Sequence, residues 1–307
     1  MAETLVAVPA RHNERVLDAR DERGGIVAGV DGSRESLTAL ARAVAIARRW
    51  QSRLFVTMVI PPFPSYRINP GARTSGNTTR LRLVLKEIEL RDILEPYPGE
   101  DWLTHEVIVG NPAEVLATVS EGRNAELIVV GRAKHEAMSR LFEVDTTVEV
   151  MRLAATPVMA VNKGQDPPTT AVAAIDFFPA SIRAARAALR VLGTTGTLYL
   201  PYVAPPSDLL PAGFILPNGE AASNDPAKRL RHIAQLLAAP QGVQIEPIVL
   251  RGTPVPAVAQ FADAVDADLV AMGSHGRTRA QRFLLGSVST SLVRTIERTI
   301  LVAPPDE

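Results

Sequence analysis

The sequence predicts an α/β protein in which one structural unit occurs twice along the chain. Short apolar runs of buried-strand length alternate with longer segments of helical spacing. The order of these elements in the first half recurs in the second, and 307 residues are enough for two domains of ordinary size. Alternating strands and helices indicate a parallel sheet covered on both faces, and we expect strand order 3-2-1-4-5 in each half.

Each element of the first half has a local signal, either an apolar run, an amphipathic stripe or a proline in a first helical turn. The expected strands are 25–30, 54–60, 104–109, 127–130 and 157–161. The expected helices are 35–50, a segment with helical spacing at Leu81, Val84, Leu85 and Ile88, one that starts at Gly110-Asn111-Pro112, and 147–155. A loop is expected from Pro61 to Thr79. These apolar stripes, including Leu37 in helix 35–50, are interpreted as core.

The second half repeats this order at a constant shift. Gly252 and Gly273 follow Gly110 and Gly131 by 142 positions, and Arg282 and Arg294 follow Arg140 and Arg152 by the same number. The expected elements are strands 171–175, 196–203 and 268–272 and helices 182–192 and 228–237. We therefore divide the chain into a charged N-terminal extension (1–24), a first domain (25–163), a linker (164–170) and a second domain (171–307).

Composition excludes several classes of function. Basic and acidic residues both number 33, which gives no electrostatic case for nucleic acid or anionic lipid. Without cysteine there are no disulfides, thiolate metal sites or cysteine nucleophiles. The five histidines show no metal-ligand spacing, and no catalytic base or nucleophile stands out. The start of the chain is unlike a signal peptide and no apolar run reaches membrane-spanning length, so we expect a soluble cytoplasmic protein.

A glycine-containing stretch follows the strand at 268–272. Gly273 and Gly276 would let the backbone come close to a ligand, and Gly286-Ser287 stands where a helix begins. A strand that runs into a glycine loop and then a helix can hold a phosphate with backbone N–H groups and the helix dipole. The alternative is a strand-to-helix connection without a ligand. The Ser287 hydroxyl would then be an N-cap and not a phosphate contact.

Asp176 is expected at the same edge, because it follows the first strand of the second half. First and fourth strands are neighbours in the order 3-2-1-4-5, so Asp176 and Gly273 would meet where ligands collect in open α/β sheets. In place of Gly32-Ser33-Arg34, which follow Asp31 in the first half, Asp176 is followed by Phe177-Phe178-Pro179. These aromatic rings would stack on a base, cover the crevice or pack inside the protein.

The spacing Gly273-x2-Gly276-x9-Gly286-Ser287, together with Val30-Asp31-Gly32-Ser33 and Gly110-Asn111-Pro112-Ala113, resembles the universal stress protein family. The chain as a whole is similar to tandem-domain members from actinobacteria, including mycobacteria. The resemblance implies a Rossmann-like, adenine nucleotide alpha hydrolase-like fold in each half and a pseudo-dimer of the halves through their fifth strands. It also implies ATP binding. The implied nucleotide contacts are Asp176, Val203, Met272, Gly273, Gly276, Gly286, Ser287 and Val288.

The first half keeps only part of this pattern. Asp31 and Gly131 are present and are weaker candidate contacts. Lys134 replaces the second glycine, and Val144-Asp145 replaces Gly-Ser, which puts a carboxylate where phosphate would bind. We therefore expect ATP, with Mg²⁺ if it accompanies the nucleotide, mainly in the second domain.

Three functions follow from these patterns. The leading one is a stress-response regulatory protein whose signal is ATP occupancy, with an unknown protein partner and a homodimer as the expected assembly. The first alternative is a slow ATP hydrolase, and the second is a nucleotide-independent protein-interaction module.

Overall fold

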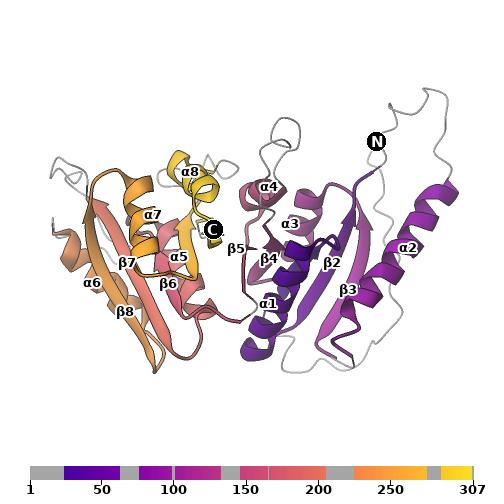
Figure 1. Cartoon of the computed structure of the whole chain (residues 1–307), viewed down its shortest axis with the longest axis horizontal. Helices are drawn as coiled ribbons and strands as arrows, with labels where there is room; N and C mark the ends of the chain where they lie inside the picture. The colour runs from indigo at the N-terminus through magenta and orange to yellow at the C-terminus, as the bar shows by residue number, and fades with distance from the viewer. Residues whose placement is uncertain are drawn as a thin grey trace. The chain divides into compact units, whose positions relative to one another are not determined.

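The structure is a computed structural model, and it describes residues 24–62, 76–98, 101–132, 146–164, 166–204, 225–274 and 285–305. It divides into two compact units, Met1–Gln165 and Asp166–Glu307, coloured indigo to magenta and pink to yellow in Figure 1. The charged extension predicted at 1–24 lies, except for Gly24, outside the described residues. Each unit is considered by itself below.

The first unit is a parallel five-stranded sheet in the order β3-β2-β1-β4-β5. Its strands are β1 (Ile26–Val30), β2 (Leu54–Ile60), β3 (Leu103–Val109), β4 (Leu127–Gly131) and β5 (Val158–Val161). Its helices are α1 (Arg34–Trp50), α2 (Gly76–Leu94), α3 (Pro112–Gly122) and α4 (Thr146–Leu153). The predicted strand order is confirmed for this half.

The second unit has the same topology, with its sheet in the order β8-β7-β6-β9-β10 and every pair parallel. Its strands are β6 (Thr170–Ala173), β7 (Gly196–Ala204), β8 (Val243–Arg251), β9 (Leu269–Gly273) and β10 (Thr299–Ala303). Its helices are α5 (Pro179–Val191), α6 (Pro226–Leu237), α7 (Pro254–Ala264) and α8 (Ser287–Thr295). The predicted fold class is therefore confirmed for both halves.

The helix starts follow from local sequence. Proline stands in the first turn of α3, α5, α6 and α7, where its missing N–H leaves no hydrogen bond unmade. Asn111 caps α3 by accepting from the N–H groups of Ala113 and Glu114 at 2.9 and 3.2 Å. Ser33 caps α1 by accepting from the Ser36 N–H at 3.2 Å. The central strands β1, β4, β6 and β9 are buried almost throughout, because helices cover both sheet faces.

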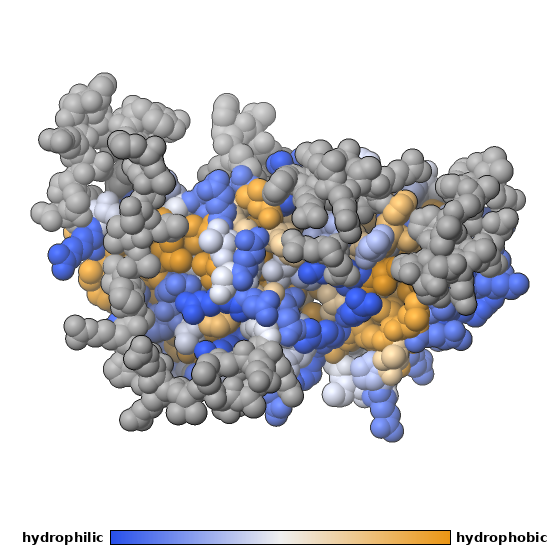
Figure 2. All heavy atoms as spheres, turned by 180° about the vertical axis from the view of Figure 1, so that it is seen from behind, coloured by the Kyte–Doolittle hydropathy of each residue, from blue (hydrophilic) through white to orange (hydrophobic). Residues whose placement is uncertain are grey.

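Two predictions about the helices are wrong. The loop expected up to Thr79 ends earlier, since α2 begins at Gly76. The stripe Leu81, Val84, Leu85 and Ile88, interpreted as core, is exposed, and so is Leu37 on α1. Helix α2 meets the sheet with other residues, namely Leu83, Leu90 and Leu94, which are buried. Figure 2 shows hydrophobic residues exposed among hydrophilic ones on the surface of the described residues.

None of the helices in the described part of the chain combines the length and the apolar character needed to cross a bilayer.

Candidate functional site

The carboxyl ends of β6, β7 and β9 bring most of the predicted contacts to one edge of the second sheet. Beyond β6, Ala174 N donates to Ala271 O of β9 and Ile175 N donates to Pro201 O of β7, both at 2.9 Å. The chain therefore stays between the two neighbouring strands until Asp176. Val203 stands one residue before the end of β7, and Met272 and Gly273 end β9. Gly276 lies outside the described residues, as do His275, Arg277, Arg279 and Arg282.

Two hydrogen bonds tie the start of α8 to the end of β9. Gly286 N donates to Ser274 O, and Ser289 Oγ donates to Gly273 O, both at 2.7 Å. These bonds place the first turn of α8, with Ser287 and Val288, next to Gly273. Seven of the eight predicted contacts thus belong to segments that meet at this edge.

Among the described residues, no side chain caps the start of α8. Gly286 is the N-cap residue and makes no side-chain bond, and Ser287 is the first helical residue, with an exposed side chain. The capping alternative for Ser287 is therefore wrong, because a hydroxyl acts as a cap from the residue before the helix. The N–H groups of the first turn point out of the helix at the positive end of its dipole, which is an arrangement suited to an anion.

Asp176 shapes a tight turn at the end of β6. Its Oδ1 accepts from Phe178 N at 3.0 Å, while its own N–H donates to Ser181 Oγ at 3.3 Å. No described residue donates to its other oxygen, Oδ2. Solvent reaches Asp176, yet protein atoms crowd its carboxyl group, and this desolvation raises its pKa above the ordinary 3.8. The hydrogen bonds that involve Ser181 and Phe178 act in the opposite direction without cancelling that rise.

Phe177 packs inside the protein, which is one of the roles considered for the two aromatic residues, whereas Phe178 is half-buried. It is buried with φ +67, and its ring centroid lies 4.6 Å from that of Tyr202 on β7. The guanidinium carbon of Arg229, from α6, lies 3.6 Å from the Phe177 ring centroid. Burial raises the pKa of Tyr202, an effect that Asp176 strengthens and Arg229 opposes.

Tyr202 and Arg229 were not among the predicted site residues. Tyr202 stands beside the predicted contact Val203 in an apolar strand. An aromatic residue in such a strand is equally typical of the core, so the sequence did not mark Tyr202 as a site residue. Arg229 is one of several basic residues at the start of α6, a pattern typical of a solvated helix face. Its burial against Phe177 depends on the packing of α6 on β7 and β8, which has no local signature.

Gly273 and Gly131 have a packing role that the two units share. A Cβ on Gly273 would lie 2.7 Å from Ser181 N, and one on Gly131 would lie 2.5 Å from Ser36 N. Both contacts are with the backbone at the start of the helix that follows the first strand. Close helix–strand packing therefore requires glycine at both positions, whether or not a ligand is bound.

The corresponding edge of the first unit keeps the acidic turn. Ser33 N donates to Asp31 Oδ1 at 2.9 Å, and Asp31 N donates to Ser36 Oγ at 3.3 Å. Desolvation is the largest single influence on the pKa of Asp31 and raises it. The hydrogen bonds that involve Ser33 and Ser36 together outweigh that influence, so the pKa is lowered overall. Lys134, Val144 and Asp145 lie outside the described residues.

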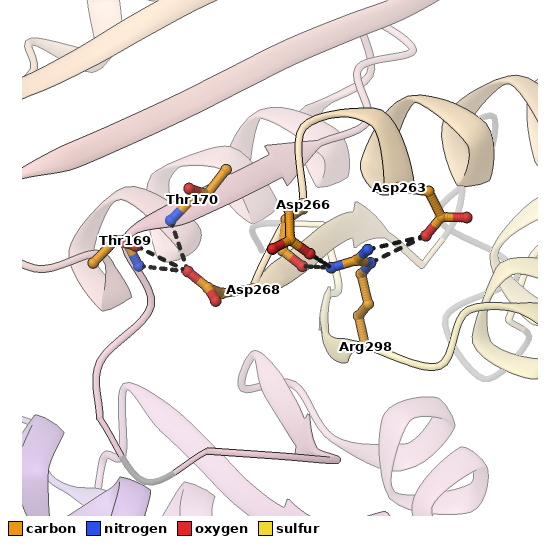
Figure 3. Close-up of polar contacts among 7 residues, drawn as sticks. Thr169, Thr170, Asp263, Asp266, Asp268 and Arg298 are labelled. Carbon is orange, nitrogen blue, oxygen red and sulfur yellow. Dashed lines mark hydrogen bonds and ion pairs between the residues drawn. The ribbon is translucent and has the colours of Figure 1, made fainter.

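Three other acidic residues of the second unit are structural. Arg298 donates to Asp263 at 3.1 Å and to Asp266 at 3.0 Å. Asp268 Oδ2 accepts from the backbone N–H groups of Thr169 and Thr170 at 2.9 and 3.0 Å (Figure 3). These bonds hold the starts of β6, β9 and β10 together, at the edge of the sheet opposite Asp176. Within the described ranges, no three His, Cys, Asp or Glu residues are grouped so that they could hold a metal ion.

Comparison with known proteins agrees with the duplicated fold. The sequence pattern of the Universal stress protein family matches residues 23–162 and again 169–304. The chain belongs to the universal stress protein family. It is similar to a universal stress protein of Mycolicibacterium smegmatis, with 25% identity over 295 residues that cover 92% of this chain and 97% of that protein.

Two further known proteins are similar to part or most of the chain. A universal stress protein of Methanocaldococcus jannaschii is 38% identical over 61 residues, which span 20% of this chain and only 36% of that protein. The crystal structure of a universal stress protein from Archaeoglobus fulgidus aligns with a TM-score of 0.65 at 19% identity, covering 92% of this chain and 96% of that one. At this identity the structural likeness supports the tandem fold alone.

Proposed function

We propose that the second unit binds ATP and that its occupancy is a regulatory signal in the stress response. The observation that supports this most is the start of α8, where Gly286 supplies no capping side chain and the exposed Ser287 follows, directly beside the end of β9. The phosphates would lie at this helix start, and adenine would lie near Asp176 and Val203.

The phosphate end has the chemistry that a polyanion needs. The N–H groups of the first turn of α8 donate hydrogen bonds, the helix dipole is positive there, and the Ser287 hydroxyl adds a donor. Gly286 contributes no side chain between the helix start and a ligand. Mg²⁺ would arrive with the nucleotide, since phosphate oxygens and water supply most of its usual ligands.

The adenine end has a matching acceptor. A carboxylate accepts hydrogen bonds and cannot donate them, so the free Oδ2 of Asp176 suits the exocyclic amine of adenine. Oδ1 is already fixed by Phe178 N, which holds the carboxyl plane in one orientation. Because β7 pairs with β6, Val203 stands near Asp176 at the same edge and would line the base.

The proposed signal requires two states of the protein that bind ATP with different affinity. Residues 275–284, which lie outside the described part of the chain, connect the end of β9 with the start of α8, the two segments that would hold the phosphates. If these residues contact the phosphates, ATP binding would be coupled to their conformation. A partner protein that distinguishes the bound from the free form would then detect occupancy. The first unit would bind weakly or not at all, because Lys134 and Asp145 replace the glycine and serine.

The decisive variant is Ser287→Glu. Glutamate at the first position of a helix interacts favourably with the dipole, by about 0.3–1 kcal/mol, so α8 should stay folded. Its carboxylate would nevertheless compete with phosphate for the same N–H groups. The purified parent should release about one adenine nucleotide per chain on denaturation or show a raised unfolding temperature with ATP. Ser287→Glu should do neither, with or without Mg²⁺.

The matched control is Thr253→Glu. Thr253 is the exposed N-cap of α7 and makes no capping bond, so this variant adds the same charge to another helix start of the same unit. It follows β8, which is separated from β9 by β7 and β6. ATP binding should survive there. The proposal fails if the parent neither contains nor responds to ATP, or if both glutamate variants bind as the parent does.

A further inference from the structure

Helix α2 of the first unit has apolar residues on two different faces. One face buries Leu83, Leu90 and Leu94 within the unit. The second face carries four residues at the spacing i, i+3, i+4 and i+7, which places them on one stripe of two helical turns. These residues and their exposed fractions are Leu81 (59%), Val84 (51%), Leu85 (55%) and Ile88 (51%). We call this set the α2 stripe.

The fold does not require such a stripe. Helix α6 occupies the same place in the second unit and buries Leu230, Ile233 and Leu237. Among its described residues it exposes one large apolar side chain, Leu236. Helix α2 lies beside β3, the outermost strand of its sheet, so its outer face borders solvent (Figure 1). Contiguous exposed apolar patches rimmed by charge are typical of interaction sites.

The charges beside the α2 stripe indicate what binds there. At 100° per residue, Arg80 and Glu87 flank one side of the stripe together with Arg91, which binds Glu87 of its own helix, and Arg82 and Glu89 flank the other side. In both pairs the arginine precedes the glutamate by two turns. If two copies of α2 pair antiparallel about an axis between Val84 and Leu85, Arg80 and Arg82 each face a glutamate of the other copy. A parallel pair would instead place like charges side by side.

We propose that the α2 stripe is a self-association surface, on which a second copy of this chain binds through its own α2 in antiparallel orientation. Leu81 of one copy faces Ile88 of the other, and Val84 faces Leu85. Glu89 already binds Lys86 at 2.6 Å, and Glu87 binds Arg91 at 3.3 Å and His105 at 3.2 Å. A carboxylate has about four lone-pair sites, so the arginines of the other copy add to these contacts. Two apolar turns form a small interface, so association is expected only at micromolar concentrations or above.

The first test measures molar mass by sedimentation from roughly 1 to 300 μM, a range chosen to span the affinity expected of a small interface. The parent should associate, and Leu85→Glu should weaken association at least about tenfold because two carboxylates would meet at the axis. Leu236→Glu makes the same change on the corresponding helix of the second unit and should associate like the parent. Both sites are exposed, so unfolding temperatures should stay unchanged. A parent that does not associate, or a Leu85→Glu variant that associates as the parent does, would overturn the proposal.

A second test uses the fact that the chain contains no cysteine. Leu85→Cys should form an intermolecular disulfide, because the two cysteines lie next to the axis. Leu81→Cys alone should not, since the two copies of position 81 would be about 10 Å apart along the helices. Mixing Leu81→Cys with Ile88→Cys should give the mixed disulfide.

Leu236→Cys measures the background from random collisions. Crosslinking of Leu85→Cys at that background rate would contradict the self-association surface. Leu81→Cys that crosslinks to itself faster than to Ile88→Cys would contradict the antiparallel orientation.

Discussion

The two units build the same turn after their first strand and fill it with different residues. In the first unit Asp31 N donates to Ser36 Oγ, and in the second Asp176 N donates to Ser181 Oγ, both at 3.3 Å. Each carboxylate also accepts from the N–H two residues on, at 2.9 and 3.0 Å. The acidic residue is therefore needed for the turn in both units. Its presence in the first unit does not by itself predict a nucleotide.

The two units differ in the residue inside the turn. Gly32 has φ +86, a conformation natural for glycine, whereas Phe177 holds φ +67 with a bulky side chain. The second unit compensates for this backbone strain by burying the Phe177 ring against Tyr202 and Arg229. The difference teaches that a strained backbone persists where side-chain packing holds it. It also leaves the start of α8 as the feature on which the proposed selectivity for the second unit depends.

The largest effect that would test this comparison is expected at Phe177. Phe177→Ala should lower the free energy of unfolding by about 3–5 kcal/mol, because a buried aromatic ring is lost. Phe177→Gly should be less harmful than Phe177→Ala by about 1 kcal/mol, since only glycine is unstrained at φ +67. Urea unfolding of the two variants measures both differences. If the alanine variant is at least as stable as the glycine variant, packing does not hold Phe177 in a strained conformation.

A smaller effect is expected where the units agree. Gly131→Ala and Gly273→Ala should each lower the free energy of unfolding by about 1–3 kcal/mol, since each methyl group would meet the backbone of a helix start. Gly122→Ala is the control, because a Cβ there meets nothing within 4 Å. Chemical denaturation compares the three. A harmless Gly273→Ala that still abolishes ATP binding would show that this glycine serves the phosphate and not the packing.

The fold could be predicted from the sequence because its elements have local signals. Buried parallel strands are apolar runs, such as Leu54–Ile60, and the Gly-x-Pro starts of α3 and α7 mark the repeat. The wrong interpretation of the α2 stripe has a physical cause. Helical spacing shows which residues share a face, but it does not show which of two apolar faces meets the sheet.

The candidate site was predicted only in part, for related reasons. Strand order brings Asp176 and Gly273 to one edge, so their proximity follows from topology. The role of Ser287 depends on whether α8 begins at that residue or one later, and helix boundaries cannot be placed that finely from sequence. Contacts such as Arg229 on Phe177 join residues far apart in the chain and leave no local pattern.

The smallest expected effect is a pH dependence of opposite sign in the two units. The pKa of Asp176 is raised in the folded protein, first by desolvation, so its protonated form favours folding. The stability that this proton contributes is present below the ordinary pKa of 3.8 and is lost as pH rises through the folded value. Asp176→Asn should therefore gain stability relative to the parent between pH 3 and pH 7.

Asp31 should behave in the opposite way. Desolvation raises its pKa, but the hydrogen bonds that involve Ser33 and Ser36 together lower it. Its contribution is present above 3.8 and is lost as pH falls through the folded pKa. Asp31→Asn should thus lose stability relative to the parent between pH 3 and pH 7, as unfolding temperatures across that range would show. If the unfolding temperatures of the two variants, each relative to the parent, change equally with pH, Phe178 in place of Ser33 does not change the electrostatics of the turn. The two turns would then be the same in charge as well as in geometry.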